Sequence, residues 1–446
     1  MGRRSHTRAL SIWANGERVG SWRMAGRGED ELIYDPHWLL STTGRPLSLS
    51  LPFVAHAAHK GDAVRNYFDN LLPDSLPIRE RIARRFRTAS ADTFDLLQAI
   101  GRDCVGAIQL LGENDAPAGI ERIDATPLTE QDVEQLLLHT TDPGPAGVQH
   151  PGEDELRISL AGAQEKTALL WHGGQWLRPH GATPTTHILK LPLGLVGHRR
   201  ADFSTSVENE WLCLNILRAY GLPVPNCAIL RFGGQKVLAV ERFDRQWHSS
   251  GRWLLRLPQE DFCQALGQPS HLKYEADGGP GMLALAGVLR QSVDAARDLG
   301  VLLSAQILFW MLGAPDGHAK NFSIRLLPEG RLRLTPLYDV MSIWPVEGNG
   351  PNQFSRHEAK LAMAVLGKNK HYQFKTIQRR HFNETARKCL YGPGAEDLIE
   401  SILTRTTAVI DEVSAMLPKG FPDRVAQTIL GGLADSARRL AAMPPH

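Results

Sequence analysis

Alternating apolar and polar positions near the start of the chain predict a β-hairpin. Strand-like runs cover residues 10–14 and 18–22, and the Asn15-Gly16 pair between them tolerates the positive φ angles of a tight turn. Helical spacing follows over 64–72 and over 77–86, and the second of these runs has a proline in its first turn. We therefore expect a mixed α/β module at the beginning of the chain.

A second region begins after a proline- and glycine-rich break at 140–147. Residues 123–138, before the break, are expected to form a helix with Glu130 and Asp132 near its N-terminus. After the break, short apolar runs separated by Gly and Pro predict strands, with one helix over 208–220. The predicted strands cover 157–160, 167–171, 186–191, 227–232 and 237–243.

Beyond about residue 255 the periodicity is mainly helical, over 294–312 and from 395 to the end. Strands with one helix, followed by a helical segment, are the order of a two-lobed kinase catalytic domain. We predict an α+β protein in which a protein-kinase-like catalytic region follows an N-terminal mixed α/β module. The expected parts are the N-terminal module at 1–125, a helix and linker at 126–150, an N-lobe-like ATP-binding part at 151–245, and a helical C-lobe-like catalytic part at 246–446.

Composition narrows the class of protein. The chain has 446 residues, and single cores usually stop growing at about 250–300 residues, so several domains are expected. The net charge of +2 gives no argument for nucleic-acid binding, and the basic run over 79–87 has the spacing of a solvated helix face. Five scattered cysteines without a Cys-x-x-Cys pair argue against a zinc ribbon or a disulfide framework. A soluble, cytoplasmic protein without a signal peptide or a membrane span is expected.

The segment from Asp316 to Asp339 has the pattern of a phosphoryl-transfer site. Such a site needs a carboxylate beside the attacking hydroxyl and oxygen ligands that hold magnesium against the phosphates. Asn321 follows Asp316 by five positions, as a metal-binding Asn follows the catalytic Asp in protein kinases, and apolar runs at 322–326 and 331–334 predict a hairpin before Asp339. Each residue alone is better explained as a turn former or a helix cap. The combination favours a magnesium-dependent kinase with Asp316 as its catalytic base.

Other residues fit a nucleotide site around this segment. Lys190 ends a predicted strand from which it can reach phosphates, with Glu210 or Glu208 as its ion-pair partner, although a snorkelling surface lysine is the alternative. Glu241, Arg242 and Phe243 end another strand, where an interlobe hinge would meet adenine. The expected phosphate-covering loop has one glycine and matches neither common glycine-rich motif. It consists of Ala161, Gly162, Ala163, Gln164, Glu165 and Lys166.

Longer motifs resemble those of the HipA family of bacterial toxin kinases, in the family's order from the N-terminal module to near the C-terminus. These motifs are 157–169, 185–190, 239–245, 257–261, 277–281 and 316–323. Pro315 departs from the family, which commonly has threonine before the Asp. The proline fixes one φ angle and removes one donor, but it leaves the catalytic side chains intact.

The resemblance implies the toxin half of a type II toxin–antitoxin system, a serine/threonine kinase that uses ATP and Mg²⁺. Its substrate would be a protein serine on glutamyl-tRNA synthetase or another aminoacyl-tRNA synthetase, and translation failure would cause growth arrest and persistence. Its partner would be a HipB-like helix-turn-helix antitoxin that binds operator DNA. The implied roles are Asp316 as proton acceptor, Asn321 and Asp339 as magnesium ligands, Lys190 and residues 161–166 at the phosphates, Glu241 and Phe243 at adenine, and His318 and Lys320 beside the same nucleotide.

Ser159 matches a serine that is autophosphorylated in this family. A dianionic group beside the triphosphate would repel it and could pull the loop out of the cleft, whereas the simpler interpretation is an ordinary strand serine.

Two alternative functions stay open. One is a small-molecule kinase, because Asp-x-His-x-x-Asn also occurs in kinases resembling aminoglycoside phosphotransferases. The other is a catalytically idle corepressor that is bound to DNA with its antitoxin. Arg379, Arg380 and His381 could then touch operator DNA, although an exposed basic turn is the simpler interpretation.

Overall fold

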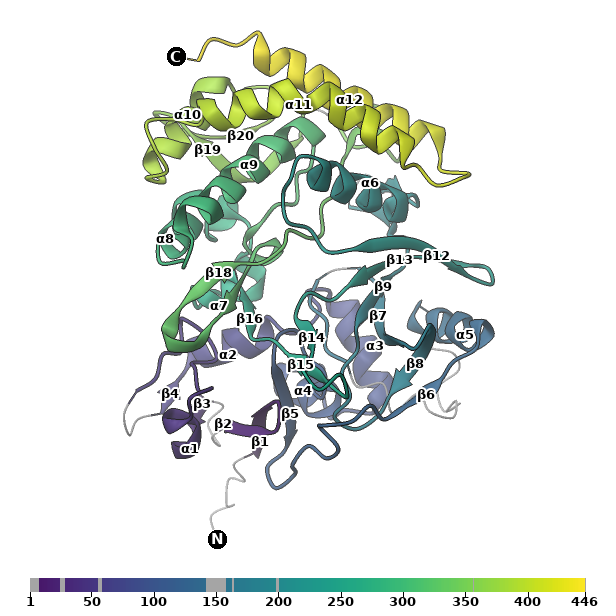
Figure 1. The fold of residues 1–446 in the computed structure, drawn as a ribbon, viewed down its shortest axis with the longest axis vertical. Coiled ribbons are helices and arrows are strands. Elements are labelled where there is room, and N and C mark those ends of the chain that lie inside the picture. Colours follow the sequence, from purple (N-terminus) through teal and green to yellow (C-terminus); the bar gives the residue numbers. More distant parts are fainter. Residues whose placement is uncertain are drawn as a thin grey trace.

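The computed structural model describes residues 8–24, 29–54, 58–141, 158–162, 164–197, 200–355 and 357–445. The N-terminal module lies at one end of the long axis, a second sheet lies beside and above it, and a helical lobe forms the other end (Figure 1). The predicted α+β class, with a strand-rich part before a helical part, is confirmed.

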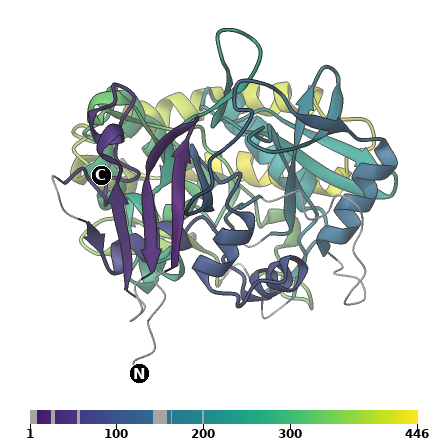
Figure 2. The ribbon, with the colours of Figure 1, turned by 90° about the horizontal axis from the view of Figure 1, so that it is seen from below.

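The N-terminal module is built on a five-stranded antiparallel sheet in the order β4-β3-β2-β1-β5. The predicted hairpin is formed by β1 (Arg8–Ala14) and β2 (Glu17–Met24), whose strands lie side by side in Figure 2. Trp22 stacks on Phe68 with ring centroids 4.0 Å apart, so helices cover one face of this sheet. The other elements are β3 (Asp30–Tyr34), α1 (Pro36–Leu40), β4 (His59–Lys60), α2 (Asp62–Asp69), α3 (Leu76–Phe86), α4 (Thr93–Ile100) and β5 (Ile108–Gly112).

The second sheet has six strands in the order β12-β13-β9-β7-β8-β6, and α5 (Glu130–Thr141) packs against it through Val133 and Leu137. Helix α6 (Ser206–Ala219) contacts this sheet on one side and the helical lobe on the other, which explains why its residues are almost all buried. The strands are β6 (Ala125–Pro127), β7 (Lys166–His172), β8 (Gln175–Pro179), β9 (His187–Lys190), β12 (Cys227–Phe232) and β13 (Gln235–Glu241), and a small hairpin of β10 (Gly194–Val196) and β11 (Ala201–Phe203) precedes α6.

Two predicted elements in this part are wrong. The expected helix over 123–138 begins only at Glu130, because Thr129 and Asp132 cap it by exchanging hydrogen bonds, and residues 125–127 pair with β8 as a strand. The expected strand over 157–160 is absent from the described residues 158–160, where Ile158 forms an isolated bridge to Asp103. The N-terminal module, and not a neighbouring strand, holds this segment.

The helical lobe surrounds α9 (Ala295–Leu312), close to its predicted bounds. Among the described helices α9 alone has the length and apolar composition to cross a membrane, but it is mostly buried and packs against α8, α11 and α12, as a core helix does. The lobe and the segments leading to it contain β14 (Arg245–Trp247), β15 (Leu254–Arg256), β16 (Gln259–Asp261), α7 (Phe262–Ala265), α8 (Met282–Leu289), β17 (Ser323–Leu326), β18 (Leu332–Leu334), β19 (Lys360–Leu366), β20 (Lys370–Gln373), α10 (Arg379–Lys388), α11 (Glu396–Ala415) and α12 (Asp423–Ala441).

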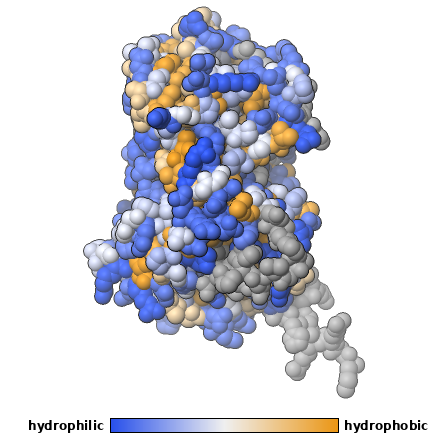
Figure 3. Space-filling model, turned by 90° about the vertical axis from the view of Figure 1, so that its right-hand side faces the viewer, coloured by the Kyte–Doolittle hydropathy of each residue, from blue (hydrophilic) through white to orange (hydrophobic). Residues whose placement is uncertain are grey.

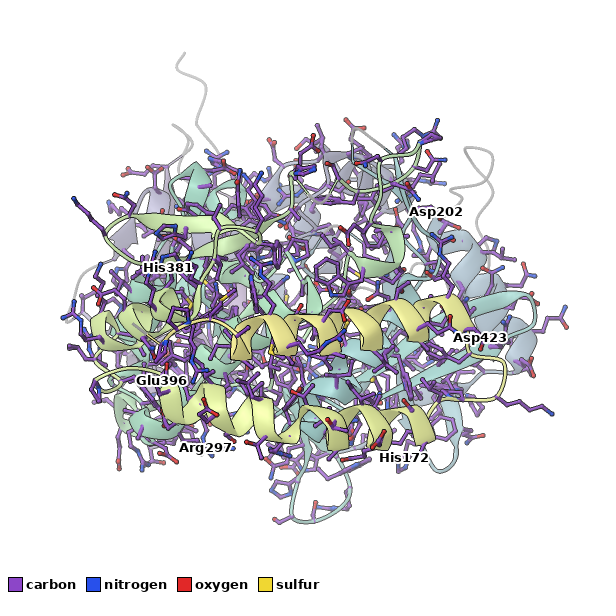
Figure 4. All side chains as sticks on the ribbon, turned by 90° about the horizontal axis from the view of Figure 1, so that it is seen from above. His172, Asp202, Arg297, His381, Glu396 and Asp423 are labelled. Atoms are coloured by element: carbon purple, nitrogen blue, oxygen red, sulfur yellow. The ribbon has the colours of Figure 1, made fainter. Side chains whose placement is uncertain are left out.

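The predicted exposed basic turn at residues 379–381 is wrong. Arg379 is not part of an exposed basic turn: it begins α10, and its buried side chain forms ion pairs with Glu396 and Glu400. His381 is also buried and stacks on His371, and Figure 4 shows His381 and Glu396 at the same end of the lobe. The five cysteines are free thiols. On the face in Figure 3, hydrophilic side chains predominate and apolar ones gather in separate patches.

Candidate active site

A cavity of about 720 Å³ lies where the N-terminal module, the six-stranded sheet and the helical lobe meet. Its volume is within the range of small-molecule and cofactor sites. Most of the predicted site residues line it, whereas Glu165 does not and Ala163 lies outside the described residues. The predicted residues on its wall are Ala161, Gly162, Gln164, Lys166, Lys190, Glu241, Arg242, Phe243, Asp316, His318, Lys320, Asn321 and Asp339.

Lys190 connects the two lobes across the cavity. From the end of β9, its Nζ donates to Oε1 of Glu210 on α6 at 2.6 Å and to Oδ1 of Asp339 at 3.0 Å. Burial disfavours the charged ammonium, but Asp339 and Glu210 outweigh this effect and raise the pKa of Lys190. The structure also decides between the two candidate partners, because Glu208 instead accepts from Lys236. Lys190 is therefore a buried cation and not a snorkelling surface lysine.

Asp339 occupies a strained loop position rather than a helix cap. Its φ of +61° lies in the left-handed region, which residues other than glycine rarely adopt. Residues with such backbone angles are often found at functional sites. Burial opposes its ionisation, but the positive charges of Lys190 and Lys166 lower the pKa of Asp339 to about 2. Its carboxylate is thus ionised at neutral pH, as a metal ligand must be.

The catalytic-loop geometry follows from the hairpin of β17 and β18, which forms as predicted. The Nδ2 of Asn321 donates to the backbone oxygen of Asp316 at 2.8 Å, so its carboxamide oxygen is the atom left for a metal. The Asp316 side chain is 42% exposed, and its Oδ1 accepts from the hydroxyl of Tyr274 at 2.5 Å. His318 Nε2 lies 3.8 Å from the same oxygen, and burial lowers the pKa of His318. The carboxylate predicted to be the base is therefore open to solvent on one side and held by Tyr274 on the other.

The predicted phosphate loop lies against the N-terminal module. Ser159 is fully buried, and its hydroxyl donates to the backbone oxygen of Leu71 at 2.7 Å. Glu165 forms an ion pair with Arg81 of α3, so the basic run of that helix is not simply a solvated face. Gly162 has a φ of +107°, and a Cβ there would lie 2.6 Å from Nζ of Lys166. Glycine is required at this position both for the backbone angle and for the approach of the lysine.

The residues of the predicted hinge also line the cavity. The backbone N–H groups of Glu241 and Arg242 donate to the backbone oxygens of Asn226 and Thr186, each at 2.8 Å. The Arg242 guanidinium is buried and forms ion pairs with Asp103 and Asp244, so its side chain has a structural role. The side chain of Phe243 lines the cavity, with its ring 5.8 Å from that of Tyr338. A role in adenine binding stays a prediction for these residues.

Sequence reasoning missed three residues at the catalytic end of the cavity, namely Asp74, Lys273 and Tyr274. The carboxylate of Asp74 accepts from Lys273 Nζ at 2.8 Å and from Lys320 Nζ at 2.6 Å. The order of residues in the chain gave no indication of these contacts, because a Leu-Leu-Pro-Asp sequence reads as an ordinary turn. The motif around residues 277–281 passes close to Tyr274 and was the nearest available signal.

The residues present fit a magnesium nucleotide. Among the described residues, the side-chain amine of Lys166 has neither a hydrogen bond nor an ion pair, and it faces the glycine of the predicted phosphate loop. The described residues include no group of three His, Cys, Asp or Glu that could hold a metal ion alone. Asn321 and Asp339 supply hard oxygen ligands, and magnesium typically combines one or two carboxylates with substrate phosphates and water. This arrangement is that of a protein-kinase-like phosphotransferase.

Comparisons with known proteins identify the family. The HipA N-terminal domain matches residues 10–111, and the HipA-like C-terminal domain matches residues 158–413. A Sinorhizobium fredii protein described as "Putative kinase Y4mE" is 34% identical over 364 residues, which are 80% of this chain and 83% of that protein. "Serine/threonine-protein kinase toxin HipA" of Shewanella oneidensis is 28% identical over 349 residues, 74% of this chain and 72% of that protein. The chain belongs to the HipA family of serine/threonine-protein kinase toxins.

A solved structure shows that the fold is shared along nearly the whole chain. The Shewanella oneidensis complex of HipA, HipB and operator DNA contains a chain that superimposes with a TM-score of 0.77 at 23% identity. The match covers 97% of this chain and 98% of that one, so the N-terminal module, the second sheet and the helical lobe all have counterparts there.

Proposed function

We propose that this protein is the toxin kinase of a type II toxin–antitoxin system and that it transfers the γ-phosphate of ATP to a protein serine. The observation that carries the proposal is the convergence of Lys190, Asp316, Asn321 and Asp339 on one cavity in a chain of the HipA family. The proposed compartment is the cytoplasm, where free thiols such as the five cysteines of this chain persist.

Each residue receives a role from its position. Asp316, the exposed carboxylate, accepts the proton of the attacking serine hydroxyl. Asn321 and Asp339 hold magnesium, and bound Mg-ATP supplies the phosphoryl group that is transferred. Lys190 and Lys166 neutralise phosphate charge, and the rest of the loop from Ala161 to Glu165 covers it. Lys320 and His318 border the same nucleotide, whose adenine lies toward Glu241, Arg242 and Phe243.

The proposed substrate is an aminoacyl-tRNA synthetase, with the glutamyl enzyme as the first candidate. Its phosphorylation would inhibit translation and lead to growth arrest and persistence. The proposed partner is a HipB-like helix-turn-helix antitoxin, through which the protein meets operator DNA. The complex of HipA, HipB and operator DNA from Shewanella oneidensis, whose HipA chain has the same fold, supports this partner.

We further propose autophosphorylation at Ser159, with inactivation as its result. The Ser159 hydroxyl is buried and bonded to Leu71, so the segment must leave its place before the hydroxyl can reach any active site. A phosphoserine has no room in that buried position, and its charge would keep the segment out of the cleft. Ser159→Ala should therefore abolish inactivation during incubation with Mg-ATP. Inactivation at the wild-type rate in Ser159→Ala would refute the assignment of this serine.

The test of the function is transfer of labelled γ-phosphate from Mg-ATP to a panel of purified aminoacyl-tRNA synthetases, each with its tRNA. Wild type is compared with Asp316→Asn, and Asp423→Asn, an exposed carboxylate on α12 (Figure 4), is the matched control. Labelling of one synthetase that depends on Asp316 supports the proposal. Self-labelling without a labelled synthetase would move the acceptor to another protein or a small molecule. Loss of all labelling in folded wild type would favour the idle corepressor.

A further inference from the structure

The segment Leu71–Asp74 of the N-terminal module reaches into the catalytic end of the cavity. It connects α2 to α3, and Asp74 lines the cavity although it is 246 positions from Lys320 in sequence. Its two carboxylate oxygens are divided between two lysines: Oδ1 accepts from Lys320 and Oδ2 from Lys273. Each lysine lies next to catalytic machinery, because Lys320 precedes Asn321 and Lys273 precedes Tyr274, which bonds to Asp316.

These contacts are largely shielded from solvent. The exposed fractions of the side chains are 3% for Lys320, 14% for Asp74 and 15% for Lys273. Burial disfavours the charge on Asp74, but the two lysines outweigh this effect and hold its pKa well below the usual range. The cluster of Asp74, Lys273 and Lys320 has two ammonium groups and one carboxylate, so by itself it carries one positive charge that a phosphate oxygen can pair with.

The same segment also holds the predicted phosphate loop. The backbone N–H of Asp74 donates to the oxygen of Gly162 at 3.1 Å, and Pro73 forms a parallel bridge with Gly162. The hydroxyl of Ser159 donates to the backbone oxygen of Leu71, which precedes Asp74 by three positions. One short piece of the N-terminal module therefore contacts both the loop that would cover the phosphates and the loop that carries the catalytic base.

A lysine needs such an anchor to act at a fixed position. Its ammonium is a point charge on a flexible four-carbon stem and has three donors. Asp74 takes one donor from Lys320 and one from Lys273, which leaves further donors on each amine for a ligand. Without the carboxylate, two like charges at the same end of the cavity would repel each other, and both stems would be free to choose other rotamers.

We propose that Asp74 is a positioning residue of the kinase, which fixes the ammonium groups of Lys320 and Lys273 at the phosphate end of the cavity. The N-terminal module would thereby contribute a residue to the proposed active site and not only a separate domain to the chain. The proposal rests on the proposed function of this cavity as the phosphotransfer site, and it concerns the alignment of the bound nucleotide more than its affinity.

The test separates turnover from binding. Asp74→Asn keeps the shape of the side chain and removes its charge, and Glu80→Gln, an exposed acidic residue of the neighbouring helix α3, is the matched control. Turnover is measured by label transfer from Mg-ATP, and nucleotide affinity by titration with Mg-ADP. Asp74→Asn should lower kcat by about 10- to 100-fold, as misplacement of catalytic groups does, while affinity for Mg-ADP changes by less than about threefold. Wild-type kcat in Asp74→Asn would overturn the proposal.

Two further variants guard against a purely structural effect. Asp74→Glu retains the charge and should recover part of the kcat that Asp74→Asn loses. If Asp74→Asn does not fold, Asp74→Glu is the variant that tests the proposal. Wild-type kcat in Asp74→Glu together with an unfolded Asp74→Asn would then point to a structural role and overturn the proposal. In a Lys320→Met background, Asp74→Asn should cost far less than it does in wild type, because the two residues act together. Losses that simply multiply would overturn the claim that Asp74 acts through Lys320.

Failure of this inference is distinguishable from failure of the proposed function. If wild type transfers no more label than Asp316→Asn, the cavity is not a phosphotransfer site and both fail. If wild type is active, Asp316→Asn is inactive and Asp74→Asn equals Glu80→Gln, the kinase stands and the positioning role of Asp74 alone is refuted.

Discussion

Lys166 is expected to destabilise the free protein while it strengthens nucleotide binding. Its amine has no hydrogen bond or ion pair among the described residues, and Gly162 lies directly against it. Burial, reinforced by the positive charge of Lys190, lowers the pKa of Lys166 from 10.5 to about 8. A lysine whose pKa is lower in the folded than in the unfolded state reduces stability, because the folded state disfavours its charge.

The size of this cost follows from the pKa. A shift from 10.5 to about 8 corresponds to roughly 3 kcal/mol in the free energy of unfolding. Because Lys166 is partly exposed and not fully buried, solvent screening reduces the expected cost to about 1–2 kcal/mol. The cost is fully present below about pH 8, decreases as the folded protein releases the proton above that pH, and vanishes above about pH 10.5. Lys166→Met should therefore stabilise the free protein at pH 7 and have little effect near pH 10.5.

The nucleotide complex should respond in the opposite direction. A hydrogen bond from an ammonium to a phosphate contributes about 1.5–3 kcal/mol, so Lys166→Met should weaken Mg-ADP binding by roughly 10- to 100-fold at pH 7. Raising the pH through about 8 should also weaken binding to the wild type, because the free enzyme then loses the proton that the phosphates require. The variant should lack this part of the pH dependence.

The assay compares urea midpoints at pH 7 and pH 10 with calorimetric titration of Mg-ADP at the same pH values. Lys419→Met, which removes an exposed lysine, is the matched control. The reasoning is refuted if Lys166→Met is less stable than wild type at pH 7, or if it binds Mg-ADP as tightly as wild type does.

Two further predictions concern buried ion pairs. Glu210→Gln leaves Lys190 with Asp339 as its remaining acidic partner and should lower kcat/KM for ATP by at least about 10-fold; a Glu208→Gln control of equal activity loss would contradict the pairing. Asp103→Asn removes the carboxylate that the buried Arg242, Arg245 and Arg256 share, and it should reduce the free energy of unfolding by about 3–5 kcal/mol. The reduction is measured as the shift in urea midpoint relative to wild type. A change below about 1 kcal/mol would show that these ion pairs contribute little to stability.

Local pattern explains which elements were predictable. The Asn15-Gly16 hairpin, the buried helix α9 and the β17–β18 hairpin each depend on residues close in sequence, and each formed as expected. The predicted helix over 123–138 is too long at its N-terminus because the apolar spacing continues into a strand, and the cap at Thr129 marks the true start of the helix. The burial of Arg379 is not predictable from its own segment, because its partners, Glu396 and Glu400, lie on another helix.

The sequence by itself determined the kinase-like order of elements, the family and the residue types of the proposed phosphotransfer site. Spacing predicted that Asp316 and Asn321 before a short hairpin and Asp339 after it meet at one loop edge, because five positions and a short hairpin leave the chain little freedom. Only the tertiary structure decided that Glu210 and not Glu208 pairs with Lys190, and that Asp74 holds Lys320 from another domain. Contacts between residues more than 200 positions apart depend on how whole layers pack, and such packing leaves no periodic trace in a single sequence.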